Sequence, residues 1–364
     1  MKSLYQGFLT LLKDYIFNRL SYTINYPLVK PWRINFDITY NCPLHCRMCN
    51  IWKEKVDHKH ELKLKELKRI IDEVHEWGID HISFAGGETL TKKRTVIELT
   101  RYARSKNIRV DLITNGVLLD KKTAKTLLES DISKISLSVD GAKEKTHDSL
   151  RGKGSFKKVI NAAKMLTKLK NKMKSSVELE FTTVVCGINF RELVDVFHLM
   201  ESLSFNYINY QVVVPDNTFS MPLEQFHEFY NSPLWIKEKD LPEFERITKK
   251  LVLLKKKTGK IRNTRRYLLT MPQYFKEREK FKTGMCIVGY SYININPYGF
   301  INVCGLGPNI NVKEGRLKKL WKDKRYKLTR IRIKKCKRPC LMLCYEKLNL
   351  KELIEAWLEL RGLL

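Results

Sequence analysis

Three cysteines lie close together near the start of the chain, in the segment Cys42-Pro-Leu-His-Cys46-Arg-Met-Cys49. Thiolates are soft ligands, and three of them in one short loop can hold three irons of a cubane iron–sulfur cluster. The fourth iron then stays open to a ligand that the protein does not supply. The spacing therefore predicts a [4Fe-4S] cluster whose open iron is the place where chemistry occurs.

A structural zinc site is the alternative interpretation of this loop. Zinc needs four closed ligands, and His45 would be the fourth. Zinc loops prefer paired Cys-x-x-Cys knuckles, however, and the adjacent His45 and Cys46 would be awkward to point at one metal. The spacing thus favours the cluster.

The chain has nine cysteines, and eight of them fall into two groups. The second group is near the C-terminus and comprises Cys286, Cys304, Cys336, Cys340 and Cys344. Cys186 stands alone and is expected to be a core or pocket thiol. Because no apolar leader with a small-residue cleavage site is present, a cytoplasmic location is expected, where cysteines serve as metal ligands or reactive thiols more often than as disulfides.

Strand-like and helix-like segments alternate from residue 33 to residue 214. The pattern predicts strands at 33–39, 81–85, 109–113, 134–139, 177–184 and 207–214, with a helix after each of the first five. Six such units predict an α/β fold with parallel strands and helices outside, either a partial barrel or an open doubly wound sheet. In both architectures the active site lies at the carboxyl ends of the strands, and the cysteine loop follows the first strand.

Short polar and glycine-containing segments follow the later strands in the same way. Gly86–Glu88 follows the second strand, Thr114–Gly116 the third, and Ile135–Gly141 covers the fourth, with Asp148–Gly152 soon after. Together with the Cys-x3-Cys-x2-Cys spacing, this order resembles the radical S-adenosylmethionine (SAM) superfamily. The resemblance implies a partial (β/α)6 TIM-type barrel in which a cluster and SAM produce a 5′-deoxyadenosyl radical that takes hydrogen from a substrate C–H bond.

The resemblance also implies roles for individual residues. Cys42, Cys46 and Cys49 would bind the cluster, and the Glu88 carboxylate would bind the SAM ammonium. Glycines without a Cβ would let the backbone approach SAM closely. Where the superfamily usually has an aromatic residue before the third cysteine, this chain has Met48, whose thioether can pack against adenine. The expected SAM-binding residues are Met48, Gly86, Gly87, Glu88, Thr114, Asn115, Ser138 and Arg151.

The second cysteine group resembles the SPASM and twitch extensions, which carry auxiliary iron–sulfur clusters. The element Cys286 to Gly299 to Cys304 fits, whereas the end of the group departs from the full SPASM pattern, which has seven cysteines. Five cysteines suffice for one auxiliary [4Fe-4S] cluster but not for two with complete cysteine ligation. A shortened, twitch-like domain is therefore expected, with a zinc site or loose thiols as the alternatives.

Partners and substrate follow less directly from the sequence. SPASM and twitch enzymes commonly modify peptides or proteins, so a peptide or protein substrate is expected, with a flavodoxin or ferredoxin as electron donor.

The formal charge of +30 includes a basic run at 249–266 and fourteen bases within 313–338. An amphipathic helix in residues 1–20, with Leu4, Phe8 and Leu12 on one face, would combine with this charge on an anionic membrane. The alternatives are therefore a lipid-modifying radical SAM enzyme at the membrane surface and a non-catalytic metal protein that binds nucleic acid.

The chain is expected to have four parts. Residues 1–31 form the N-terminal helix and lead-in, and residues 32–215 form the radical SAM core. Residues 216–283 form a basic helical linker or insertion, and residues 284–364 form the auxiliary cluster domain with a C-terminal helix. No run of about 18 apolar residues is present, so no helix that spans a membrane is expected.

Overall fold

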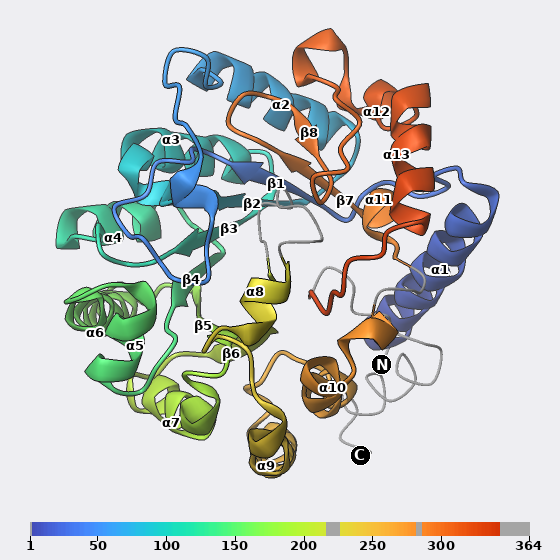
Figure 1. Cartoon of the computed structure of the whole chain (residues 1–364). Helices are drawn as coiled ribbons and strands as arrows, with labels where there is room; N and C mark the ends of the chain where they lie inside the picture. Colours follow the sequence, from blue (N-terminus) through green and yellow to red (C-terminus); the bar gives the residue numbers. More distant parts are fainter. Residues whose placement is uncertain (1, 216–225, 282–285, 343–364) are drawn as a thin grey trace.

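The computed structural model describes residues 2–215, 226–281 and 286–342. Six parallel strands form the central sheet, in the spatial order β6-β5-β4-β3-β2-β1 (Figure 1). Their bounds are β1 Arg33–Asp37, β2 His81–Ala85, β3 Arg109–Thr114, β4 Lys134–Ser138, β5 Glu178–Val185 and β6 Tyr207–Val212. Strands β1 and β6 are not hydrogen-bonded to one another, so the barrel is open on one side. The predicted partial α/β barrel is confirmed.

Helices connect successive strands along the outer side of this curved sheet (Figure 1). Their bounds are α2 Leu64–Glu76, α3 Lys93–Arg104, α4 Lys121–Glu129, α5 Glu144–Arg151, α6 Ser155–Met173 and α7 Leu193–Ser202. Apolar side chains at helical spacing turn toward the strands, as Ile70, Ile71 and Val74 do on α2. A side-chain oxygen of Asp120 accepts from Thr123 N at 2.7 Å and caps the start of α4.

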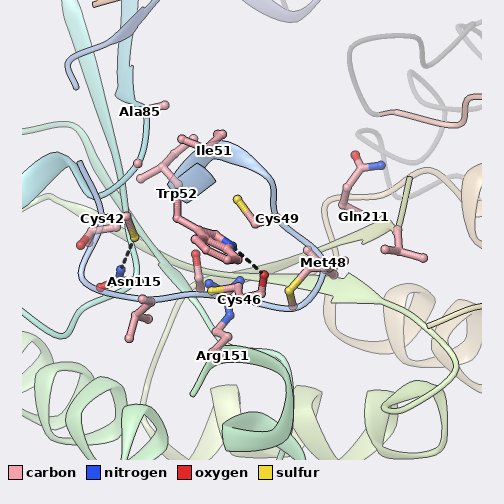
Figure 2. A pocket seen from close by; sticks show the side chains of 18 of the residues that line it. Cys42, Cys46, Met48, Cys49, Ile51, Trp52, Ala85, Asn115, Arg151 and Gln211 are labelled. Atoms are coloured by element: carbon pink, nitrogen blue, oxygen red, sulfur yellow. Dashed lines mark hydrogen bonds between the residues drawn. The ribbon is translucent and has the colours of Figure 1, made fainter. Parts of the chain in front are cut away.

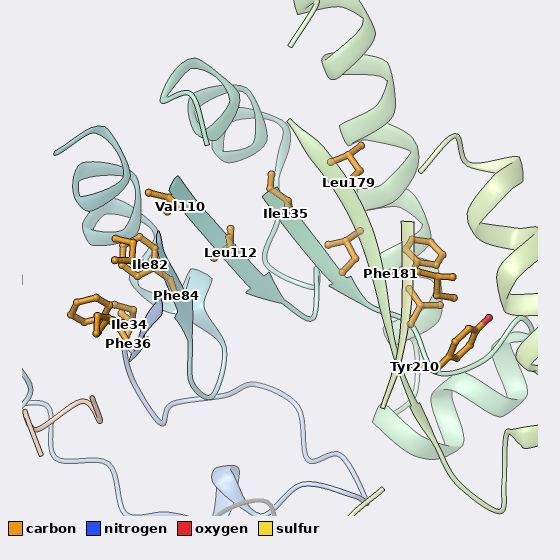
Figure 3. Packing of buried hydrophobic residues seen from close by; sticks show 14 of the residues in the cluster. Ile34, Phe36, Ile82, Phe84, Val110, Leu112, Ile135, Leu179, Phe181 and Tyr210 are labelled. Carbon is orange, nitrogen blue, oxygen red and sulfur yellow. The ribbon is translucent and has the colours of Figure 1, made fainter. Parts of the chain in front are cut away.

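The two faces of each strand differ in character. On β1, Ile34 and Phe36 are 0% and 1% exposed and pack in the apolar layer between sheet and helices (Figure 3). The alternate residues of β1, among them Asn35 and Asp37, face the barrel interior. Ile113 shows that this interior is open, because it lies on the central strand β3 and keeps 38% of its surface exposed. The sheet therefore separates a dry outer layer from an accessible, largely polar interior.

A C-terminal hairpin extends the same sheet beyond β1. Strands β7 Tyr292–Ile295 and β8 Ile301–Asn302 pair antiparallel and form this hairpin. Strand β7 also pairs parallel with β1, with Arg33 opposite Tyr292 and Phe36 opposite Ile295. The last part of the chain is thus hydrogen-bonded directly to the strand that precedes the cysteine loop.

The remaining helices lie before and after the six-strand sheet in the sequence. Helix α1 Lys2–Ile24 precedes it, and the segment after β6 contains α8 Phe226–Asn231, α9 Leu241–Thr258 and α10 Arg265–Lys276. The C-terminal region adds α11 Val288–Ser291, α12 Leu317–Leu320 and α13 Lys324–Lys334. Short 3-10 turns occur at Ile51–Lys53, Thr89–Lys92, Phe190–Glu192, Glu238–Asp240, Arg278–Phe281 and Val312–Glu314.

The helix predicted around residues 350–360 lies outside the described residues. Within the described ranges, none of the helices combines the length and the apolar character needed to cross a bilayer.

Candidate active site

A pocket of about 260 Å³ lies at the carboxyl ends of the strands (Figure 2). It is bounded by the cysteine loop on one side and by the ends of β2, β3, β4 and β6 on the other. Ten of the predicted site residues line it, namely Cys42, Cys46, Met48, Cys49, Gly86, Gly87, Thr114, Asn115, Ser138 and Arg151. The eleventh, Glu88, is 1% exposed and lies behind the pocket wall.

The cysteine loop is held to the barrel at several points. Asn115, at the end of β3, donates from Nδ2 to the Cys42 sulfur at 3.8 Å. The Arg47 amide donates to the Leu150 carbonyl at 2.9 Å, which ties the loop to α5. Trp52 donates from Nε1 to the Cys46 carbonyl at 3.3 Å (Figure 2). These bonds fix the loop from both sides of the pocket.

The three thiols of the loop fit a cluster better than a single metal ion. All three thiols line one pocket, but within the described residues no three Cys, His, Asp or Glu side chains converge as ligands of one ion would. Thiolates of a cubane bind different irons and so need not converge. His45, the proposed fourth zinc ligand, is exposed and stacks on Trp52 with ring centroids 4.5 Å apart.

The environment of the thiols favours their neutral form in the absence of metal. Burial raises the pKa of the Cys42 thiol to about 11, and burial likewise raises the pKa of Cys46, with Arg151 opposing that shift. A metal binds the thiolate and displaces the proton. The cost of a buried negative charge is therefore compensated only when iron is bound.

The two glycines after β2 are required by the protein's own packing. A Cβ on Gly86 would lie 2.3 Å from the Thr39 carbonyl oxygen, and a Cβ on Gly87 would lie 2.5 Å from that of Tyr40. This closeness lets the Gly87 amide donate to the Thr39 carbonyl at 2.7 Å. The glycines thus join the end of β2 to the start of the cysteine loop, a role that the sequence pattern alone does not reveal.

Glu88 connects two of the strand-end loops. Its Oε1 accepts from the Thr114 hydroxyl at 2.6 Å and from the Leu90 amide at 2.9 Å, while Oε2 accepts from the Asn115 amide at 2.8 Å. Burial raises the pKa of this carboxyl, and the three hydrogen bonds oppose the shift. In this structure the carboxylate positions Asn115 and Thr114 at the pocket wall. A contact between Glu88 and the SAM ammonium stays a prediction.

Arg151 brings a positive charge to the cysteine loop. Its Nε donates to Asp140 Oδ2 at 2.5 Å, and its side chain extends from the end of α5 toward Cys46 (Figure 2). Burial lowers the pKa of Arg151, but the charge of Asp140 more than compensates, so the guanidinium stays protonated. Asp140 Oδ1 also accepts from the Val184 amide at 2.7 Å. Asp140 therefore holds Arg151, α5 and β5 together.

Several pocket residues were not predicted from the sequence. They come from the cysteine loop and the turn after it, from the ends of β2, β3, β5 and β6, and from the C-terminal segment, namely Leu44, Ile51, Trp52, Ala85, Ile113, Val184, Gln211, Val212, Val213, Val214 and Met342. The position of Gln211 at the carboxyl end of β6 is the signal that would have indicated it as a pocket residue. Its Nε2 donates to the Leu341 carbonyl at 3.2 Å, and the Tyr267 hydroxyl donates to the same oxygen at 2.9 Å. The C-terminal segment thus forms one wall of the pocket.

The C-terminal cysteines are described only in part. Cys286, Cys304, Cys336 and Cys340 are partly buried, and Cys344 lies outside the described residues. Cys286 precedes α11, Cys304 follows β8, and Cys336 and Cys340 follow α13. As in the first loop, no three of these described side chains converge on one point. Cys186 is 0% exposed within the apolar core, as expected, and burial raises its pKa to about 12.

An open parallel barrel that presents three cysteine thiols at its carboxyl edge has the architecture of an iron–sulfur enzyme. Residues 36–200 match the Radical SAM superfamily. The chain is therefore a radical SAM enzyme, and enzymes of this superfamily bind a [4Fe-4S] cluster and SAM. This identification favours catalysis over the alternative of a non-catalytic metal protein.

Similar proteins differ in the activities that they carry. The AdoMet-dependent heme synthase of Methanosarcina barkeri is 26% identical over 308 residues, which are 80% of this chain and 82% of that protein. The mycofactocin maturase MftC of Mycolicibacterium smegmatis is 34% identical over 137 residues, covering 38% of this chain and 34% of the maturase. The solved structure of anSMEcpe with bound AdoMet and Cp18Cys peptide has a TM-score of 0.60 at 20% identity, covering 91% of this chain and 98% of that one. The last likeness shows the fold.

Proposed function

We propose that Cys42, Cys46 and Cys49 hold the cluster and that the pocket beside them binds SAM. The supporting observation is that the three thiols, the glycine turn after β2 and the polar ends of β3 and β4 line one pocket. When cluster and SAM are bound, they supply a 5′-deoxyadenosyl radical that abstracts hydrogen from a substrate C–H bond. The cofactor carries the difficult chemistry, and the protein orients the reactants.

The chain's own residues would act mainly by positioning. Asn115 donates to the Cys42 sulfur and is itself fixed by Glu88, so the loop and the third strand keep their relative placement. Arg151, held by Asp140, offers positive charge beside thiolates and SAM. Val184, Val213 and Val214 form an apolar wall that limits the access of water.

We propose a peptide or protein as the substrate. The relative that supports this is the mycofactocin maturase, which is 34% identical over part of the barrel. The sheet also stays open between its two edge strands, β6 and β8 (Figure 1). An auxiliary cluster on the C-terminal cysteines belongs to the same proposal.

A tetrapyrrole is a second candidate substrate. The observation in its favour is the similarity to the heme synthase, which extends over 80% of this chain. The chain's excess of 30 positive charges would also attract a substrate that carries carboxylates. The two candidates differ in the charge of the group that would enter the barrel.

The electron donor and a membrane surface are further proposed partners. We expect a low-potential flavodoxin or ferredoxin, because reductive cleavage of SAM needs one electron from outside the chain. Peripheral binding to an anionic membrane is supported by exposed apolar residues on α1, including Ile16 at 51% and Ile24 at 50%. A lipid substrate would follow only if such binding were observed.

Formation of 5′-deoxyadenosine tests the catalytic proposal. The reconstituted and reduced chain is expected to cleave SAM slowly even without substrate. Replacing Cys42, Cys46 and Cys49 together by Ala should abolish the product, because no thiolates remain for the cluster. The matched control is Cys186→Ala, which removes a buried thiol outside the pocket. Unchanged turnover in the triple variant would refute the assignment of the cluster ligands.

A further inference from the structure

Asp37 lies at the end of β1, on the strand face opposite to Ile34 and Phe36. Those two residues pack in the apolar layer, so Asp37 faces the barrel interior. In the register of β1 and β2, Asp37 lies opposite Ala85, which lines the pocket. Asp37 also keeps part of its surface accessible. The carboxylate therefore borders the space next to the candidate SAM site.

The partners of Asp37 are neutral amides. Asn35 Nδ2 donates to Oδ1 at 3.2 Å, and Asn294 Nδ2, on β7, donates to Oδ2 at 2.7 Å. Burial raises the pKa of Asp37 to about 6, and the hydrogen bonds from the two side-chain amides offset this rise only in part. Within the described ranges of the chain, no ion pair involves Asp37, and no nearby cation contributes to its titration.

Other interior carboxylates of the barrel are paired with cations. Asp111 lies 3.0 Å from His81 and 3.1 Å from Lys134, and Glu180 lies 3.4 Å from Lys134. A charge taken out of water is costly unless a cation compensates for it. Among the residues that the structure describes, Asp37 thus has donors that orient it but no cation that neutralises it.

We propose that Asp37 binds a protonated primary amine of the substrate, such as a lysine side chain or an amino terminus. This inference rests on the proposed function, since it assigns a substrate contact beside the SAM pocket. Each carboxylate oxygen accepts one amide hydrogen bond and keeps the capacity for another. An ammonium has three N–H donors and a full positive charge, so it can donate to the carboxylate oxygens and neutralise their charge. Substrate carboxylates would instead be repelled there.

The experiment uses the full-length, cluster-loaded enzyme with SAM under anaerobic conditions. The probes are N-acetyl-lysine methylamide and its neutral isostere N-acetyl-norleucine methylamide, each at concentrations up to about 100 mM. A ligand that binds only the folded protein raises the melting temperature by mass action. We expect the lysine probe to raise it saturably by ~2 °C. The norleucine probe should not do so.

The Asp37→Asn variant should lose the lysine-dependent shift. The matched control is Asp111→Asn, which removes an interior carboxylate that already has cationic partners and should keep the shift. Each variant is compared with itself with and without probe, so a change in its own stability does not matter. Equal shifts for both probes, or a shift retained in Asp37→Asn, would overturn the inference. SAM cleavage by the wild type is measured separately and tests the proposed function alone.

Discussion

At the scale of single residues, Gly86 and Gly87 show how little room the site leaves. The two backbones that meet there belong to the end of β2 and to residues 39–41, which lead into the cysteine loop. Any side chain atom would have to occupy the space of a carbonyl oxygen. The placement of Cys42 therefore depends on residues that carry no functional group at all.

Replacing Gly87 by Ala is expected to destabilise the fold by about 2 kcal/mol, the usual range for overpacking. The cause is the contact of 2.5 Å that a Cβ would make with the Tyr40 carbonyl. Gly315→Ala is the control, because its Cβ would find its nearest neighbour at an ordinary 3.5 Å. Urea unfolding of both variants measures the difference. Equal urea midpoints for Gly87→Ala and Gly315→Ala would contradict this prediction, because they would show that the turn accommodates the added Cβ.

Asp37 predicts an unusual dependence of stability on pH. Its pKa is about 6 in the folded protein and about 3.9 in an unfolded chain. Between these values the folded state binds more protons, so this group makes stability fall as pH rises through that window. Asp37→Asn removes this pH dependence, so the stability of the variant relative to the wild type should be higher at pH 8 than at pH 5 by about 1.4 kcal/mol.

Urea unfolding at the two pH values checks this expectation. Asp80→Asn, at an exposed position, serves as the control. A stabilisation of Asp37→Asn that is the same at pH 5 and pH 8 would contradict the pKa on which the prediction depends.

The sequence identified the chemistry-bearing residues more readily than their neighbours. The spacing of Cys42, Cys46 and Cys49 is a local signal, and the structure places all three at one pocket. Asp140 pairs with Arg151, which is 11 positions away in the sequence. The hydrogen bond from the Asn294 side chain to Asp37 spans 257 positions. Such contacts depend on the tertiary arrangement, and no local pattern encodes them.

At the scale of elements, the strands were predicted to within a few residues because apolar and polar residues alternate along them. Predicted strand 81–85 is observed as His81–Ala85, and predicted strand 207–214 ends earlier, at Val212. The side-by-side placement of β1 and β7 could not be predicted. Strand β7 has only four residues, and its pairing partner lies about 260 residues earlier in the chain.

The exposed apolar residues of helix α1 predict binding to a membrane surface. Ile16, Phe17, Leu20 and Ile24 are exposed at helical spacing, and Lys334 of the basic helix α13 lies 4.7 Å from the ring centre of Tyr22 on α1. Apolar side chains beside basic ones favour an anionic bilayer surface, with roughly 1 kcal/mol for each base close to the headgroups. We expect the protein to float with anionic vesicles at low salt and less at high salt.

The variant that tests this carries Phe17→Asp and Leu20→Asp and should no longer float. Leu253→Asp is the matched control, because Leu253 is 67% exposed on the basic helix α9, away from α1 in sequence. If Leu253→Asp and the α1 variant lose flotation equally, general charge and not the α1 surface governs binding. Protein that stays below both anionic and neutral vesicles contradicts membrane binding altogether.

At the scale of the whole molecule, iron content distinguishes one cluster from two. One cluster at the first loop and one at the C-terminal cysteines give about eight irons per chain. Replacing Cys286 and Cys304 by Ala should lower the content to about four while 5′-deoxyadenosine still forms without substrate. Mössbauer spectroscopy with iron analysis provides the count. About four irons in the wild type, or stoichiometric zinc, would exclude an auxiliary cluster.

The parallel pairing of β7 with β1 has a consequence for how the chain is made. Strand β1 leaves the ribosome early, whereas β7 is synthesised only after nearly 290 residues have emerged. Until then β1 remains an edge strand whose free N–H and C=O groups can pair with other chains. Its last residues lead directly into the cysteine loop. The nascent barrel is therefore most open to aggregation, and to premature oxidation of its thiols, in the interval before the C-terminal hairpin docks.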